Sequence, residues 1–108
     1  MIPDDEAQAI ADCWVESFSA NPYVLGERKM DAWFELDGLI QSHPQSALVV
    51  FEKVAEMDLI NWTFEGIAVG PLRTFLMLHG DLFERELGAI MRRSKAFHEM
   101  LAMAVEGI

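Results

Sequence analysis

Apolar residues recur along this chain at steps of three and four positions, which is the spacing of one face of an α-helix. The first such segment starts at Pro3, with three acidic residues that interact favourably with the helix dipole. It ends at Asn21-Pro22, because a residue before proline avoids the helical region. We therefore expect a first helix with Asp12 and Glu16 on its polar face. Its apolar stripe consists of Ala7, Ile10, Ala11, Trp14 and Phe18.

Two further helices are predicted before residue 56. One runs from about Lys29 to Ser42, and a break at His43-Pro44 separates it from the next. Helices joined by so short a turn are expected to pack antiparallel. The expected buried positions are Met30, Trp33, Phe34 and Ile40 in the first of these helices, and Ala47, Leu48, Phe51, Val54 and Ala55 in the second.

The middle of the chain alternates helical segments with glycine and proline. Asp58 can cap a short helix from Leu59 to about Glu65. The run Ile67-Ala68-Val69 is β-like but too short for a sheet, so we interpret it as a buried helix or connector. Gly70-Pro71 predicts a sharp restart with Pro71 in the first helical position, and Gly80 a left-handed helix end.

Two more helices complete the pattern. Asp81 followed by Glu84 suggests a capping box, and Ser94 is expected to cap the last helix. The expected buried positions are Phe83, Leu87, Ile90, Met91, Phe97, Met100, Leu101, Ala104 and Val105. The fold class is therefore all-α: six to seven short helices packed as antiparallel helical hairpins, or as a short irregular α-superhelix. We expect residues 1–108 to form a single helical domain.

Charge changes the functional picture more than it changes the fold. The 108 residues carry a net charge of −10. Residues 1–70 hold 13 acidic and three basic side chains, whereas residues 71–108 hold five of each. Such acidity disfavours nucleic acid as a ligand, and it either favours basic partners or serves solubility alone. No apolar run approaches the roughly 20 residues of a membrane span, and no signal peptide is recognisable, so we expect a cytoplasmic protein with no membrane partner.

One segment resembles a known signature. Ile67-Ala68-Val69-Gly70-Pro71-Leu72, followed by Leu76, His79 and Gly80, resembles the Gly-Pro-Leu … His-Gly signature of an uncharacterised bacterial family of small helical domains, a domain of unknown function. The resemblance extends over about residues 33–101, and Arg73 stands where the family carries an acid. It implies a helical fold and a bacterial or phage origin, but no activity. We interpret the signature as a structural corner with Arg73 exposed beside it; the corner residues are Gly70, Pro71, Leu72 and Gly80.

Groups that could carry chemistry are few. Cys13 is the only cysteine, which excludes an internal disulfide and favours a small core residue. His43, His79 and His98 are never three or four positions apart, so they lack the spacing of a helical metal site. Paired carboxylates such as Asp4 with Asp5 suit a solvated face better than a catalytic cleft. We therefore expect no metal, no cofactor and no enzymatic activity.

These patterns favour a non-enzymatic protein-binding module. Small size, segregated acidity and surplus aromatic residues fit a small bacterial or phage inhibitor or immunity-type protein that covers a basic surface on its target. A homo-oligomeric structural or scaffold protein is the first alternative, and a cryptic enzyme built on the cysteine or the histidines is the second. The candidate partner-binding residues are Asp12, Glu16, Glu27, Asp31, Glu35 and Asp37.

Overall fold

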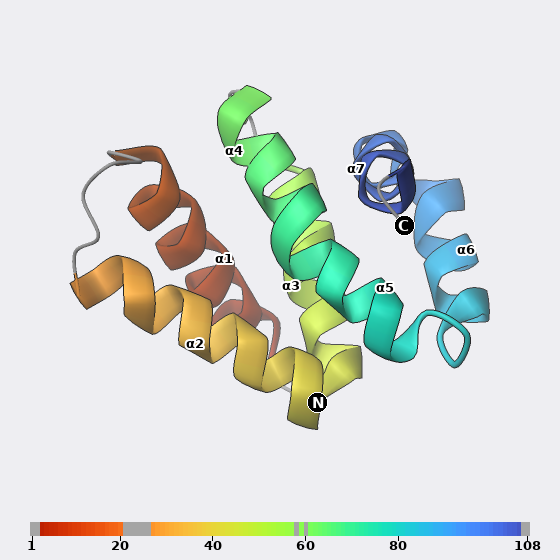
Figure 1. Cartoon of the computed structure of the whole chain (residues 1–108), viewed down its shortest axis with the longest axis horizontal. Coiled ribbons are helices and arrows are strands. Elements are labelled where there is room, and N and C mark those ends of the chain that lie inside the picture. Colours follow the sequence, from red (N-terminus) through yellow and green to blue (C-terminus); the bar gives the residue numbers. More distant parts are fainter. Residues whose placement is uncertain (1–2, 21–26, 58, 60, 107–108) are drawn as a thin grey trace. The chain divides into compact units, whose positions relative to one another are not determined.

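The computed structural model describes the backbone of residues 3–20, 27–57, 59 and 61–106, and the side chains of 3–16, 34–57, 59 and 63–106. Within these ranges the chain is helical and contains no strand, which confirms the all-α fold class. No helix in this part of the chain has the length and apolarity needed to cross a bilayer. Figure 1 shows the elements: α1 (Asp4–Ala20), α2 (Glu27–Ser42), α3 (Pro44–Ala55), α4 (Asn61–Ile67), the π-helical segment η1 (Ala68–Leu72), α5 (Arg73–His79), α6 (Glu84–Arg93) and α7 (Lys95–Glu106).

The chain divides into two compact units, unit 1 (residues 1–54) and unit 2 (residues 55–108). Unit 1 contains α1, α2 and nearly all of α3, and unit 2 contains the later helices. The expectation of a single domain stays a prediction, for which one cooperative unfolding transition is the test.

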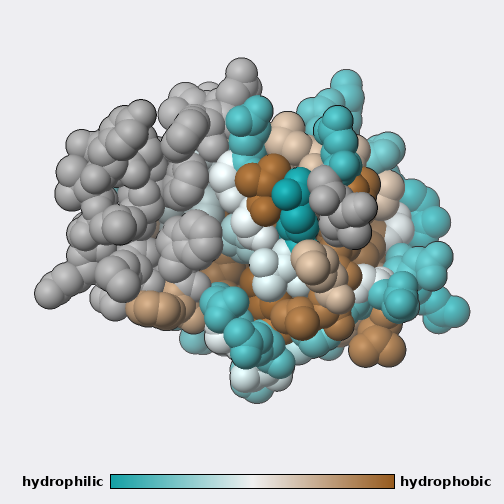
Figure 2. Space-filling model, in the orientation of Figure 1, coloured by the Kyte–Doolittle hydropathy of each residue, from teal (hydrophilic) through white to brown (hydrophobic). Residues whose placement is uncertain are grey.

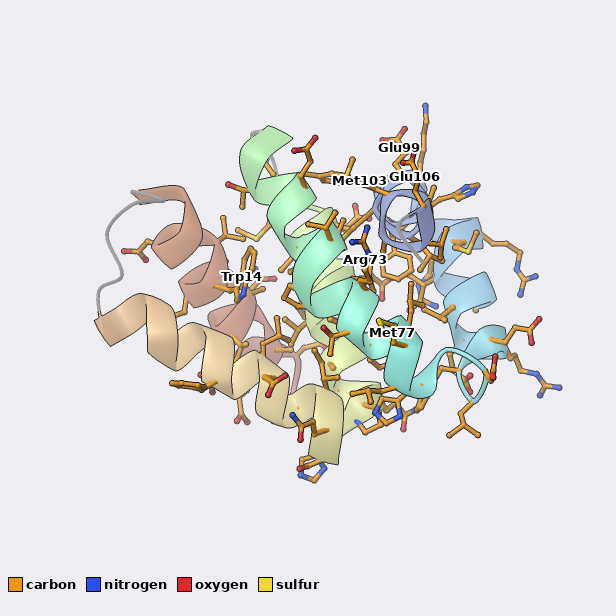
Figure 3. All side chains as sticks on the ribbon, in the orientation of Figure 1. Trp14, Arg73, Met77, Glu99, Met103 and Glu106 are labelled. Atoms are coloured by element: carbon orange, nitrogen blue, oxygen red, sulfur yellow. The ribbon has the colours of Figure 1, made fainter. Side chains whose placement is uncertain are left out.

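In unit 1, α1 packs against α2, and the two helices run in opposite directions (Figure 1). The predicted stripe on α1 is confirmed at its four described positions, which are all buried. Trp14, the largest of them, projects toward the interior of this unit (Figure 3). Cys13 is only partly buried, so its expected place in the core is not observed.

The buried face of α2 differs from the prediction, whereas that of α3 agrees with it. Phe34 was expected in the core, yet it is exposed, and Leu36 is buried four residues before Ile40. Because Trp33 and Phe34 are adjacent and both apolar, residue type alone does not decide which of them faces inward. On α3 the predicted apolar face is confirmed, and Ser46 and Val50 are buried in addition.

Unit 2 begins with one continuous helical run through α4, η1 and α5 (Figure 1). The predicted break at Gly70-Pro71 is therefore wrong, and Pro71 is buried inside η1 rather than at a helix start. Among the residues that the structure describes, no glycine has a positive φ, so Gly70 is not left-handed. The interpretation of the run at residues 67–69 as buried helix is confirmed for Ile67 and Ala68, whereas Val69 is exposed.

The π-helical geometry explains how the helix passes through a proline. Inside an α-helix, a proline ring lacks the N–H donor and clashes with the carbonyl four residues back. In η1 the N–H of Arg73 donates to the carbonyl of Ala68, five residues back, so the turn is wider than an α-helical one. The Thr74 hydroxyl also donates to the Gly70 carbonyl, at 3.1 Å. The helix therefore continues through Pro71 with a hydrogen bond to the carbonyl five residues back instead of ending there.

The turn after α5 also differs from expectation. Gly80 follows the helix with φ −51° and ψ −44°, which is right-handed rather than left-handed. Its conformation does not require glycine, but its surroundings do: a Cβ atom here would lie 2.6 Å from the Leu76 carbonyl oxygen. The predicted capping box is not formed, because α6 begins at Glu84 with Phe83 as its N-cap and no side-chain cap hydrogen bond.

The side chains of Ser94 and Arg73 both interact with the last helix, α7. Ser94 caps α7 as predicted, since its Oγ accepts a hydrogen bond from the Phe97 N–H at 3.1 Å. The same Oγ donates to the Glu56 carboxylate. Arg73 was expected to be exposed, but it is half-buried and reaches from the start of α5 toward α7 (Figure 3). Val105 was expected in the core and is exposed.

Candidate functional site

A row of carboxylates runs along the outward side of α1. Asp5, Asp12 and Glu16 are separated by seven and four residues, so they share one helical face, and all three are exposed. The buried stripe lies on the opposite face of the same helix. Gln8 orients one of these carboxylates, because its Nε2 donates a hydrogen bond to Asp12 Oδ1 at 2.9 Å. We call Asp5, Asp12 and Glu16 the α1 carboxylate row; it includes two of the predicted partner-binding residues.

A second group of polar residues lies on the exposed side of α2. Glu35 and Asp37 are both exposed, as predicted. Gln41 Nε2 donates a hydrogen bond to Asp37 Oδ2 at 2.8 Å, which orients this carboxylate. The side chains of Glu27 and Asp31, the remaining predicted partner-binding residues, lie outside the described part of the chain. Since α1 packs on α2, two neighbouring helices present acids outward; Asp5, Asp12, Glu16, Glu35 and Asp37 are named the acidic surface.

Few positive charges oppose this surface among the side chains that the structure describes in unit 1. Helix α1 contains no lysine or arginine along its whole length. Among the described side chains of unit 1, Lys53 is the one lysine or arginine, and its Nζ lies 3.8 Å from Asp4 Oδ2. A pair at this distance whose carboxylate is exposed contributes little and leaves the local charge negative. The acidic surface is therefore suited electrostatically to a cationic partner.

An exposed aromatic ring interrupts the acids on α2. The Phe34 side chain is 65% exposed and stands beside Glu35 in the sequence. Gly38, one helical turn later, is also exposed, and a Cβ atom there would have no neighbour within 4 Å. Sequence reasoning placed Phe34 in the core and did not single out Gly38. Aromatic residues, phenylalanine included, are enriched at protein interfaces relative to the rest of the surface.

The groups considered for chemistry are not brought together. His43 and His98 are exposed, whereas His79 packs in a ring cluster with Phe75 and Phe83. Among the residues whose placement is described, no three histidine, cysteine or acidic side chains are grouped so that they could hold a metal ion.

Unit 2 has a different surface. Met77 and Leu82, which flank the turn between α5 and α6, are 71% and 79% exposed, and Figure 2 shows apolar side chains near this turn. An open hollow of mixed charge lies next to it on α6. The residues that line the hollow are Asp81, Leu82, Glu84, Arg85, Gly88 and Arg92. This surface is apolar and of mixed charge, in contrast to the acidic surface of unit 1.

Comparison of the chain with protein-family models, with curated protein sequences and with solved structures finds no match. The resemblance to the bacterial family with the Gly-Pro-Leu … His-Gly signature accordingly stays a prediction.

Proposed function

We propose that this chain is a non-enzymatic protein-binding module that presents its acidic surface to a basic target. The observation that carries the proposal is the α1 carboxylate row, on a helix without a single lysine or arginine. Complementary charge of this kind accelerates association and selects among partners. The aromatic Phe34 side chain on the neighbouring helix adds an apolar anchor of the type that binding surfaces use.

The kind of target follows from the same chemistry. Carboxylates spaced along a helix can occupy the positions that phosphates take on a basic protein surface, so a target that normally binds nucleic acid fits best. A small cytoplasmic inhibitor or immunity-type protein of bacterial or phage origin is the corresponding biological role. Neither nucleic acid nor membrane is a partner in this proposal.

Neutralising the carboxylates tests the proposal with a defined probe, a labelled nona-lysine peptide. The triple variant Asp5→Asn, Asp12→Asn, Glu16→Gln removes the α1 carboxylate row. A matched control, Asp81→Asn, Glu84→Gln, Glu86→Gln, removes three exposed charges from unit 2 and changes the net charge equally. Fluorescence anisotropy at low salt measures the dissociation constant for the whole chain and for each variant.

We expect the unit 1 variant to lose at least about ten-fold in affinity and to show a flatter dependence on salt, since screening acts on the charges that remain. The unit 2 control should bind within about two-fold of the parent chain, because its charges lie outside the acidic surface. Equal losses in both variants would mean that net charge alone attracts the peptide. Absence of binding at low salt would overturn the proposal.

Self-association is a second candidate function, and the exposed apolar side chains of unit 2 favour it. Met77, Leu78 and Leu82 are all exposed within six residues of sequence. Covering this patch with a second copy would remove apolar area from water. Light scattering at micromolar concentration tests self-association. A dimer in the parent chain that becomes a monomer in the Leu82→Asp variant supports it, and a strictly monomeric parent chain excludes it.

A further inference from the structure

Two residues on the outward face of α2 have no structural explanation within the described part of the chain. Phe34 leaves most of an apolar ring in water, although the helix could carry a polar residue there. Gly38 lowers helix stability relative to alanine, yet an added Cβ would meet nothing within 4 Å, so no close contact demands glycine. The two lie four positions apart, which places them one above the other on the helix.

An oriented carboxylate completes this face. Phe34, Asp37, Gly38 and Gln41 are spaced by three, four and seven positions, so they share one side of α2. Gln41 fixes Asp37 through Oδ2, while Oδ1 accepts no hydrogen bond from any residue that the structure describes. One carboxylate oxygen therefore lies on the same helical face as an exposed ring and a position without a side chain.

We propose that this face of α2 is an arginine-binding site: the guanidinium group of a basic partner stacks on the Phe34 ring and donates a hydrogen bond to Asp37 Oδ1, while its aliphatic stem crosses Gly38. This inference rests on the proposed function and names the partner side chain that the acidic surface selects. The planar guanidinium stacks on aromatic faces and forms directed hydrogen bonds, whereas the lysine ammonium is a compact, strongly hydrated charge. A long side chain at position 38 would lean toward the ring one turn earlier, whereas glycine leaves the ring open.

Comparison of two peptides of equal length and charge tests the site. Nona-arginine and nona-lysine are titrated into the whole chain at low salt, and the ratio of their dissociation constants is the readout. The readout is the dissociation constant of nona-lysine divided by that of nona-arginine. For the parent chain we expect this ratio to be about two- to five-fold larger than the ratio that remains in the variants. Two variants should remove this extra selectivity, Phe34→Leu, which keeps an apolar side chain without a π face, and Gly38→Leu, which covers the ring.

Controls separate the site from the rest of the surface. Both variants should keep the helical circular dichroism of the parent chain, because Phe34 and Gly38 are exposed, and they should weaken nona-arginine binding more than nona-lysine binding. Met77→Leu, at an exposed apolar position of α5, should keep the parent ratio. Phe34→Trp should keep or increase it, since tryptophan is the strongest partner for a cation.

The outcomes also distinguish this inference from the proposed function. If Phe34→Leu and Gly38→Leu leave the arginine-to-lysine ratio unchanged while neutralising the α1 carboxylate row still weakens both peptides, the arginine site is wrong and the acidic binding surface stands. If neither peptide binds the parent chain at low salt, both fail.

Discussion

The Nε atom of Arg73 donates a hydrogen bond to the backbone carbonyl of Ala104, 3.0 Å away and 31 residues later in the chain. Ala104 lies in the last turn of α7, where carbonyl groups have no partner within the helix. A positive charge at this end of a helix is also favourable for the helix dipole. Arg73 therefore connects the start of α5 to the end of α7 within unit 2.

This contact reverses what the sequence suggests for Arg73. Arg73→Ala should lower the free energy of unfolding by about 1–3 kcal/mol, since the Ala104 carbonyl loses a charged donor. Arg85→Ala, which removes an exposed arginine on α6, should change it by no more than about 0.5 kcal/mol. Urea denaturation measures both values. Equal stabilities of the two variants would show that the hydrogen bond contributes nothing.

Ser94 should be the most sensitive cap in the chain. Ser94→Ala removes the acceptor for the Phe97 N–H and the donor to Glu56 in one step, and the site is buried. We expect Ser94→Ala to lower the free energy of unfolding by about 1–2 kcal/mol. Glu56→Gln keeps an acceptor and should lower the free energy of unfolding by less, as measured by thermal unfolding. A larger loss for Glu56→Gln than for Ser94→Ala would mean that the cap is the minor interaction.

Glycine substitutions should act in opposite directions at two positions. Gly80→Ala places a Cβ atom 2.6 Å from a backbone oxygen, so the backbone must shift and stability should fall by more than about 1 kcal/mol. At Gly88, inside α6, the added Cβ meets nothing within 4 Å, and Gly88→Ala should stabilise by roughly 0.4–1 kcal/mol. Melting temperatures compared by calorimetry decide this, and changes of the same sign would contradict it.

His79 should behave as a packing residue and not as a metal ligand. Its ring centroid lies 5.5 Å from that of Phe75 and 6.1 Å from that of Phe83. Adding a chelator should leave the melting temperature unchanged, while His79→Ala should lower stability by about 0.5–1.5 kcal/mol through lost ring contacts. A melting temperature that falls with chelator and recovers with zinc would instead assign a ligand role to the histidines.

Local patterns predicted the parts of the fold that local rules govern. The stripe on α1, the face of α3 and the Ser94 cap each depend on spacing within one helix or on the residue directly before it. The proline rule for α-helices does not predict the path through Pro71, because the chain forms a π turn there. The buried residues at 67–68, 71–72 and 75 recur every four positions, a spacing that an ordinary amphipathic α-helix also shows, so it gives no separate signal for the π turn.

The candidate site was predictable in its charge but not in its shape. Exposure of Asp12 and Glu35 follows from their polarity and helical position. Phe34 could not be assigned outward, because it stands in an apolar segment whose residue types alone do not decide which side chains are buried. The contact of Arg73 with Ala104 joins residues far apart in sequence, so no local pattern contains it.

The most direct test of the acidic binding surface is to map where a basic ligand touches the chain. Backbone amide chemical shifts of the whole protein, followed by NMR during titration with nona-lysine at low salt, report the contact residue by residue. We expect the largest changes along α1 and α2, around Asp12 and Asp37, and small changes in α5, α6 and α7. Changes concentrated in those three helices, or spread evenly over both units, would contradict the assignment of binding to the acidic surface.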